Sequence, residues 1–160
     1  MRLISLRFLV GPLFALLAAA GPLAAQETSL QGTWTLDLKA SQNVPEAQKG
    51  ADLKIAIRGN QLTMVRLVGE KALGTPMVLT LDGTKRPQDL GGQQATVVAK
   101  WLVRGTKFEQ VVAMQQPGSV FVATQTVVTE VSPSGGTMTR SYAIKLANEV
   151  ENRLLVYRRK

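Results

Sequence analysis

Apolar and polar residues alternate with a period of two along most of the chain. Leu53, Ile55 and Ile57, for example, fall on one side of an extended segment. Such alternation is typical of a β-strand that is buried on one face only. Only residues 45–49, within a polar segment, indicate a short helical turn. The runs that predict strands are residues 34–38, 53–57, 62–68, 77–81, 95–103, 108–114, 120–131, 138–146 and 153–159.

Turn-forming residues separate these runs. Gly59-Asn60 follows the second run and residues 132–136 follow the seventh, and Gly and Asn supply the positive φ that tight hairpin turns require. Strands joined by short links form an antiparallel meander, which must close or stack to avoid open edges. Because sandwiches need longer crossing connections, the pattern predicts an all-β fold, an antiparallel up-and-down barrel of about eight to ten strands. The longer link, residues 83–93, is expected to form a flap or rim loop.

The N-terminal segment has the residue order of a secretory signal peptide. Two arginines precede an apolar stretch, and small residues follow it up to Ala25. A membrane anchor needs ~20 uninterrupted apolar residues, whereas residues 8–25 contain two Gly-Pro pairs. We therefore predict a signal peptide at residues 1–25, one domain at residues 26–160 with no transmembrane segment, and a periplasmic or secreted location. The absence of cysteine favours a bacterial exported protein.

The chain contains no His and no Cys, which excludes many kinds of site. A thiolate nucleophile, a disulfide, a Cys/His zinc site and a His general base all need these residues. Glu109 and Glu130 could serve as a carboxylate pair, but the sequence gives no reason for them to be close together. No phosphate-binding glycine loop and no serine-nucleophile motif occurs. We therefore expect a protein that is not an enzyme and that holds neither a metal nor a cofactor.

The predicted domain carries short motifs at both ends. Gly32-Thr33-Trp34 opens the first strand, and Val156-Tyr157-Arg158 lies on the last. With these motifs and this strand order, the chain resembles the lipocalin-like (calycin) β-barrels, especially small exported bacterial proteins of that type. The Thr-Asp-Tyr signature of true lipocalins and their usual disulfide are absent. In calycins the Trp plugs one end of the barrel and an Arg near the terminal strand packs across it. The resemblance implies these structural roles for Trp34 and Arg158, with Arg153 as the second choice.

Polar residues in phase with apolar ones are the candidates for a binding site. Arg66 shares a predicted strand face with Met64, and Arg140 shares one with Tyr142. A buried arginine must be paired, and a ligand carboxylate or phosphate can pair with it in bidentate form. The Arg140-Ser141-Tyr142 triplet also resembles the Arg-x-Tyr with which fatty-acid-binding proteins grip a carboxylate. We therefore name Arg140, Tyr142 and Arg66 as ligand-binding candidates.

Two other interpretations of these arginines remain open. Their strand faces could point to solvent near strand ends, or Glu109 or Glu130 could neutralise them inside the protein. In either case the arginines would have no role in binding a ligand.

The chain is strongly basic. Its formal net charge of +8 becomes +6 when residues 1–25, which hold two arginines and no acid, are removed. Nucleic acid is a poor partner for an exported protein, so anionic envelope components are the expected partners of a basic face. We expect the chain to act as a monomer. The cations that could form basic patches are Lys85, Arg86, Lys100, Arg104, Lys107, Arg158, Arg159 and Lys160.

Two functions of different class follow from these observations. The first is an exported, non-catalytic barrel that binds a small apolar or amphipathic ligand, acidic and lipid-like if an arginine pairs with it. The second is a packed envelope barrel with no internal ligand, which acts through its basic surface on anionic envelope polymers or partner proteins. An empty apolar cavity of ~300 Å³ or more would favour the first function, and a filled interior the second.

Overall fold

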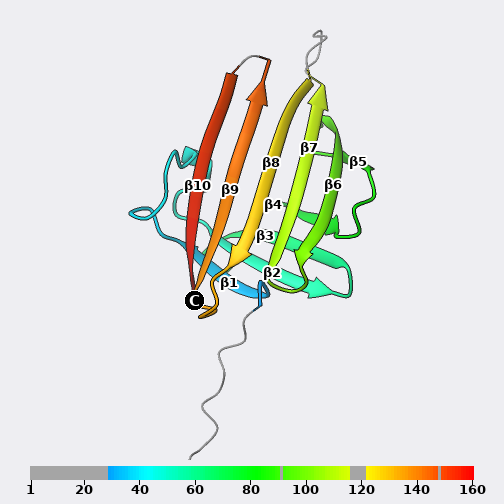
Figure 1. Cartoon of the computed structure of the whole chain (residues 1–160). Coiled ribbons are helices and arrows are strands. Elements are labelled where there is room, and N and C mark those ends of the chain that lie inside the picture. The colour runs from blue at the N-terminus through cyan, green and yellow to red at the C-terminus, as the bar shows by residue number, and fades with distance from the viewer. Residues whose placement is uncertain (1–28, 91, 116–121, 148) are drawn as a thin grey trace, which may run out of the picture.

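Almost all of the described chain is β-strand. The computed structural model describes residues 29–90, 92–115, 122–147 and 149–160, so the predicted signal peptide lies outside the described residues. The helical turn predicted at residues 45–49 is confirmed as a short 3-10 helix, η1 (Glu46–Gln48). The strands are β1 (Gly32–Leu36), β2 (Asp52–Arg58), β3 (Gln61–Val68), β4 (Lys71–Thr80), β5 (Arg86–Asp89), β6 (Gln94–Val103), β7 (Lys107–Gln115), β8 (Val122–Val131), β9 (Thr137–Leu146) and β10 (Glu149–Arg159) (Figure 1).

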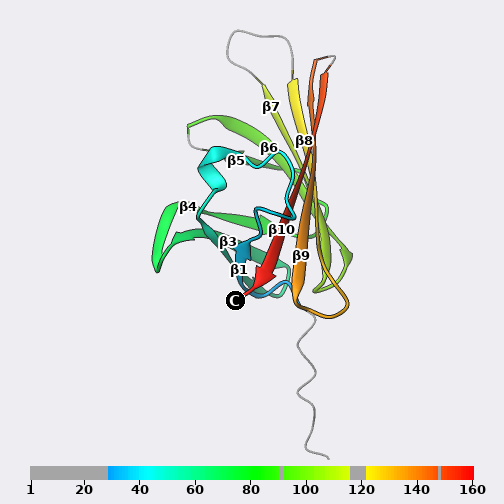
Figure 2. The ribbon, with the colours of Figure 1, turned by 90° about the vertical axis from the view of Figure 1, so that its left-hand side faces the viewer.

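The ten strands form one antiparallel sheet in the order β4-β3-β2-β1-β10-β9-β8-β7-β6-β5. Strands that are consecutive in sequence pair with each other, except that β4 does not pair with β5. In addition, β1 pairs with β10, where Trp34 lies opposite Arg159. The sheet curls, so that β2–β4 cross behind β6–β10 (Figure 1) and the two halves enclose an interior (Figure 2). The predicted all-β class and up-and-down antiparallel order are confirmed.

The two edge strands, β4 and β5, do not pair with each other. Isolated bridges from Leu81 to Ala99 and from Asp82 to Lys100 join the end of β4 to β6. The sheet is therefore a curled half-barrel with a seam between β4 and β5, rather than a fully closed barrel.

The prediction of a loop over residues 83–93 is wrong for the four residues of β5. These residues pair with β6 from Arg86 opposite Val97 to Asp89 opposite Gln94. Their sequence, Arg-Pro-Gln-Asp, has no apolar alternation, so the period-two pattern does not detect them. An edge strand tolerates Pro87, which has no N–H to donate, because only one side of the strand is paired.

The links between strands fall at two opposite ends of the molecule. The β2–β3, β6–β7 and β8–β9 links lie at one end with residues 29–31, where the Leu30 N–H donates to the Gly105 carbonyl. We call this the closed end, and the opposite end, which holds the β3–β4 link, the rim. Gly59, in the two-residue β2–β3 link, has a φ of +61°, which a glycine adopts without strain.

The hydrophobic core is densest at the closed end. Leu30, Trp34, Phe108 and Met138 are completely buried there. Toward the rim, the ends of β7–β10 extend beyond the rest of the sheet (Figure 2). The side chains therefore fill the interior at one end and leave space in the rest of it.

Candidate functional site

Trp34 occupies the closed end, as the resemblance implies. Its side chain is fully buried, and its indole Nε1 donates a hydrogen bond of 2.9 Å to the Leu30 carbonyl. The guanidinium carbon of Arg159 lies 4.3 Å from the centre of the ring. The same guanidinium donates to the carbonyls of Gln31 at 2.9 Å and Gly135 at 2.7 Å, so its charge meets a polar partner on more than one side.

The prediction that Arg158 packs across Trp34 is wrong, because that residue is Arg159. Side chains of a strand alternate between its two faces, and Tyr157 faces the core, so Arg159 faces it as well while Arg158 points outward. The Arg158 side chain is 61% exposed and forms an ion pair of 3.1 Å with Asp37. Arg153, the second choice, lies toward the rim, where its Nε donates to Glu151 at 2.6 Å.

The three ligand-binding candidates come together around one cavity. Arg66 reaches it from β3, and Arg140 and Tyr142 reach it from β9. The volume of about 270 Å³ is close to the ~300 Å³ expected of a small ligand site. The other residues that line the cavity are Gln48, Leu53, Met64, Thr75, Met77, Leu90, Gln110, Val112, Met114, Gln125 and Arg153.

The cavity is positively charged. No Asp or Glu is among the residues that line it, and Arg153 already pairs with Glu151. The Nε of Arg140 donates to the Thr129 hydroxyl at 3.3 Å, and its guanidinium carbon lies 5.4 Å from the centre of the Tyr142 ring. No carboxylate among the described residues lies within ion-pair distance of Arg66 or Arg140. Two guanidinium groups thus face the same space without an anionic partner.

Burial differs between the two arginines. Arg140 is half-buried within the row of inward-facing residues of β9. Arg66 is exposed and lies next to an irregularity in the pairing of β3 with β4, where β4 holds the extra residues. Arg140 is therefore the more strongly desolvated of the two, and it has the greater need of a partner.

The alternative in which Glu109 or Glu130 neutralises these arginines is wrong. Glu109 pairs with Lys100 at 3.1 Å, and Glu130 pairs with Lys107 at 2.9 Å. Each of these pairs joins neighbouring strands, and the four side chains of the two pairs are all partly exposed.

Ion pairs also engage most of the cations that were candidates for basic patches. Of the eight residues, Arg86, Lys100, Lys107, Arg158 and Lys160 each pair with a carboxylate. Their charge is balanced locally, which weakens the case for a strong basic face.

Sequence reasoning missed two further polar residues of the interior. Tyr157 lines a recess of about 40 Å³ that shares Arg66 and Arg140 with the main cavity. Burial raises the pKa of Tyr157 above its ordinary value, and the nearby Arg140 partly offsets this shift. Gln110 lines the main cavity and is only 2% exposed. Each residue is in phase with buried apolar neighbours, so the criterion that selected Arg66 could have found both.

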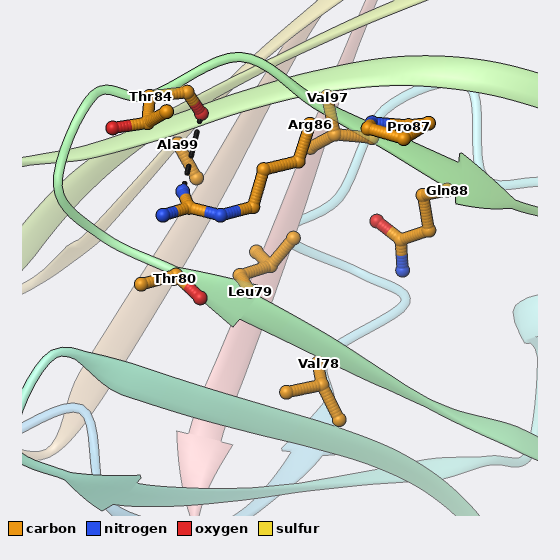
Figure 3. A pocket seen from close by; sticks show the side chains of 9 residues that line it. All are labelled: Val78, Leu79, Thr80, Thr84, Arg86, Pro87, Gln88, Val97 and Ala99. Carbon is orange, nitrogen blue, oxygen red and sulfur yellow. Dashed lines mark hydrogen bonds between the residues drawn. The ribbon is translucent and has the colours of Figure 1, made fainter.

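A second, smaller pocket lies at the seam. It has a volume of about 140 Å³ between Val78, Leu79 and Thr80 on one side and the β5 residues Arg86 to Gln88 on the other (Figure 3). Arg86 donates to both carboxylate oxygens of Asp82 at 2.7 Å and to the Thr84 carbonyl at 3.3 Å. Because this cation is already paired, the seam pocket attracts an anion less than the main cavity does.

The described part of the chain contains no helix that is long and apolar enough to cross a membrane. It also contains no cluster of acidic residues suited to holding a metal ion.

Comparison with known proteins gives matches to structures but none to sequences. No protein-family model matches the chain, and no curated protein matches it. A fatty-acid-binding protein of Schistosoma mansoni in complex with arachidonic acid matches with a TM-score of 0.55 and 17% identity, over 85% of this chain and 98% of that one. Lipid-binding protein 8 of Caenorhabditis elegans matches with a TM-score of 0.58 and 11% identity, over 86% and 99%.

A third similar structure is the ileal bile-acid-binding protein of zebrafish in complex with cholic acid. Its TM-score is 0.51 at 13% identity, over 81% of this chain and 98% of that one. The three proteins bind a fatty acid, lipids and a bile acid by name, and each is covered almost completely. The expected architecture is confirmed, and the chain has the fold of the calycin β-barrels.

Proposed function

We propose that this protein is an exported, non-catalytic barrel that binds a small amphipathic anion in its main cavity. The acidic group of the ligand lies toward Arg140 and Tyr142, with Arg66 on the opposite wall, and its apolar part lies along Leu53, Val112 and Met114. The ligand class is a carboxylic acid with a lipid-like body.

The observation that carries this proposal is the pair of arginines without an anionic partner. Of the two, Arg140 is half-buried, and a desolvated guanidinium is costly unless a counter-charge meets it. A carboxylate can accept two parallel hydrogen bonds from one guanidinium, which is the strongest arrangement open to the site. Tyr142 can donate to the same group and pack its ring against the first carbons of the ligand.

The similar structures support the same class of ligand. One is in complex with arachidonic acid and another with cholic acid, and both are acids with an apolar body. These neighbours are binding proteins, which favours a binding role over an enzymatic one for this chain. Export to the periplasm or the medium, removal of residues 1–25 and a monomeric state are further parts of the proposal, and they rest on the sequence alone.

Binding of a fluorescent fatty acid to the purified protein tests the proposal. We expect saturable binding by the wild type and at least tenfold weaker binding by Arg140→Met, since this variant keeps the length of the side chain but loses the charge. Removing one partner of a buried ion pair typically costs about 3–5 kcal/mol, and each 1.4 kcal/mol is a factor of ten in affinity. Arg158→Met is the matched control. Because Arg158 points outward, this variant should bind the fatty acid as tightly as the wild type does.

Two results would overturn the proposal. One is a wild-type protein that binds no fatty acid while its denaturation is cooperative. The other is Arg140→Met binding as tightly as the wild type. In either case the packed barrel that acts through its surface on anionic envelope polymers or partner proteins becomes the better account.

A further inference from the structure

Gln110 is a buried polar side chain without a full set of partners. It lies on β7, is 2% exposed, and lines the main cavity. Its Nε2 contacts the sulfur of Met77 at 3.5 Å, which is a weak acceptor, and its Oε1 is buried with no hydrogen-bond partner among the described residues. An unsatisfied buried acceptor typically costs a folded protein about 1–3 kcal/mol.

The position of Gln110 makes this cost notable. Its neighbours on the inward face of β7 are Phe108 and Val112, both buried and apolar. An apolar residue would continue that row without leaving a polar atom unpaired. The indole Nε1 of Trp101 is also buried with no hydrogen-bond partner among the described residues, but Trp101 lines neither the main cavity, its recess nor the seam pocket, and it packs edge-on against Phe108. Gln110 differs because its amide borders an open space that a ligand can fill.

We infer that Gln110 selects a ligand that carries a hydroxyl group on its apolar body, at a distance from the acid. This inference rests on the proposed function, because it takes the acid to lie at Arg140. A hydroxyl donates to Oε1, and it can equally accept from an amide N–H. It therefore satisfies Gln110 as a plain hydrocarbon chain cannot.

The register of the sheet gives the separation of the two polar positions. Gln110 lies opposite Val127 on β8, and Val127 lies opposite Tyr142 on β9. Arg140 is two residues further along β9 toward the closed end. Two strand spacings of about 4.8 Å and two residue rises of about 3.4 Å place the backbones of Gln110 and Arg140 about 12 Å apart along the sheet. A hydroxyl near the middle of a long-chain acid fits this separation better than one beside the carboxyl group.

Competition with the fluorescent fatty acid tests the inference. The two probes are stearic acid and a stearic acid that carries one mid-chain hydroxyl group. We expect the wild type to bind the hydroxylated acid about tenfold more tightly than stearic acid, a difference equivalent to about 1.4 kcal/mol. In Gln110→Met, which keeps a side chain of similar length without the amide, we expect this preference to disappear while stearic acid binds at least as tightly as before.

Gln88→Met is the matched control, since Gln88 lies on β5 and lines the seam pocket instead of the main cavity. It should keep the preference for the hydroxylated acid. Gln110→Met should be no less stable than the wild type in urea, because it removes a buried polar group that has an unpaired atom. A large loss of stability would mean that Gln110 is a structural residue and would overturn the inference.

Failure of the inference can be distinguished from failure of the proposed function. If both acids bind the wild type equally well, a water molecule satisfies Gln110, the inference falls and the proposed function stands. If Gln110→Met keeps the preference for the hydroxylated acid, the inference falls in the same way. If neither acid binds, the proposed function fails and the inference fails with it.

Discussion

The arginines at the two ends of the interior differ in the partners that the protein provides for their charge. At the closed end, Arg159 stacks on Trp34 and donates to backbone carbonyls, so its charge is compensated by groups that the fold holds in place. In the cavity, Arg140 meets the hydroxyls of Thr129 and Tyr157 and the ring of Tyr142, and Arg66 meets no carboxylate among the described residues. Arg159 and Arg140 are both half-buried, yet Arg159 donates to backbone carbonyls while Arg140 meets only side-chain hydroxyls and a ring.

This difference separates a structural role from a binding role. A cation with its hydrogen bonds made contributes to folding, and nothing further is gained when another molecule arrives. A cation with free donors costs the folded protein some stability, which a ligand anion can restore. Substitutions at the two ends should therefore affect different measurements, stability at the closed end and ligand affinity in the cavity.

Trp34→Ala should have the largest effect on stability. The substitution deletes a fully buried indole at the point where β1 meets the core, and deletion of a large buried aromatic residue typically costs about 3–5 kcal/mol. Urea denaturation of the wild type and the variant measures this loss. Trp34→Phe keeps most of the ring but loses the hydrogen bond to Leu30, so it should lie between the two. A midpoint for Trp34→Ala that equals that of the wild type would show that the closed end does not depend on this side chain.

Arg159→Met should have a smaller effect, of about 2 kcal/mol. It removes a cation–π contact, typically worth about 0.5–2 kcal/mol, together with hydrogen bonds from a charged group to carbonyls. The Arg159 guanidinium also packs closely on the backbone of Gly32, where a Cβ would lie 2.9 Å from Nη1, and Arg159→Met removes this contact as well.

The stability of Arg159→Met is to be compared with that of Arg140→Met and Arg158→Met. We expect Arg140→Met to be as stable as the wild type or more so, because it removes a partly desolvated charge without an anionic partner. Arg158→Met should lose less than about 1 kcal/mol, the usual worth of an exposed ion pair. Equal losses for Arg140→Met and Arg159→Met would remove the distinction between the two ends.

The period-two pattern is sufficient to predict most of this fold. Nine runs of alternation correspond to nine of the ten strands, because most of those strands bury alternate side chains; β4 is mostly exposed, and β10 buries three consecutive residues. The pattern cannot detect β5, whose four residues depend on pairing with β6 rather than on burial. The pattern also does not show that β4 and β5 fail to join, since an unpaired edge depends on how far the sheet curls.

The site is predictable only in part. Phase alone places Arg140, Tyr142 and Arg66 on inward positions, and they do line one cavity. Phase also distinguishes Arg159 from Arg158 once Tyr157 is taken as a core residue. What the sequence does not provide is the neighbour across the sheet: the partners of Glu109 and Glu130 lie on adjacent strands, and register decides which charges meet.

The smallest predicted effect concerns the ion pair between Asp82 and Arg86 at the seam. It tests whether this pair stabilises the part of the sheet where β4 and β5 do not pair. Hydrogen bonds from Arg86 and from the Thr84 N–H hold the pKa of Asp82 well below its ordinary value. A lowered pKa in the folded state means that the stabilisation is present above the ordinary carboxyl pKa of about 3.9 and is lost as the pH falls through the lowered value. Asp82→Asn should therefore melt slightly below the wild type at pH 7, and the difference should shrink under strongly acidic conditions. Because the pair is partly exposed, the difference should be small at any pH.

Glu149→Gln, an exposed change with no ion pair to a described residue, serves as the control and should show no such trend. If Asp82→Asn has the same melting temperature as the wild type at pH 7, the ion pair does not stabilise the seam.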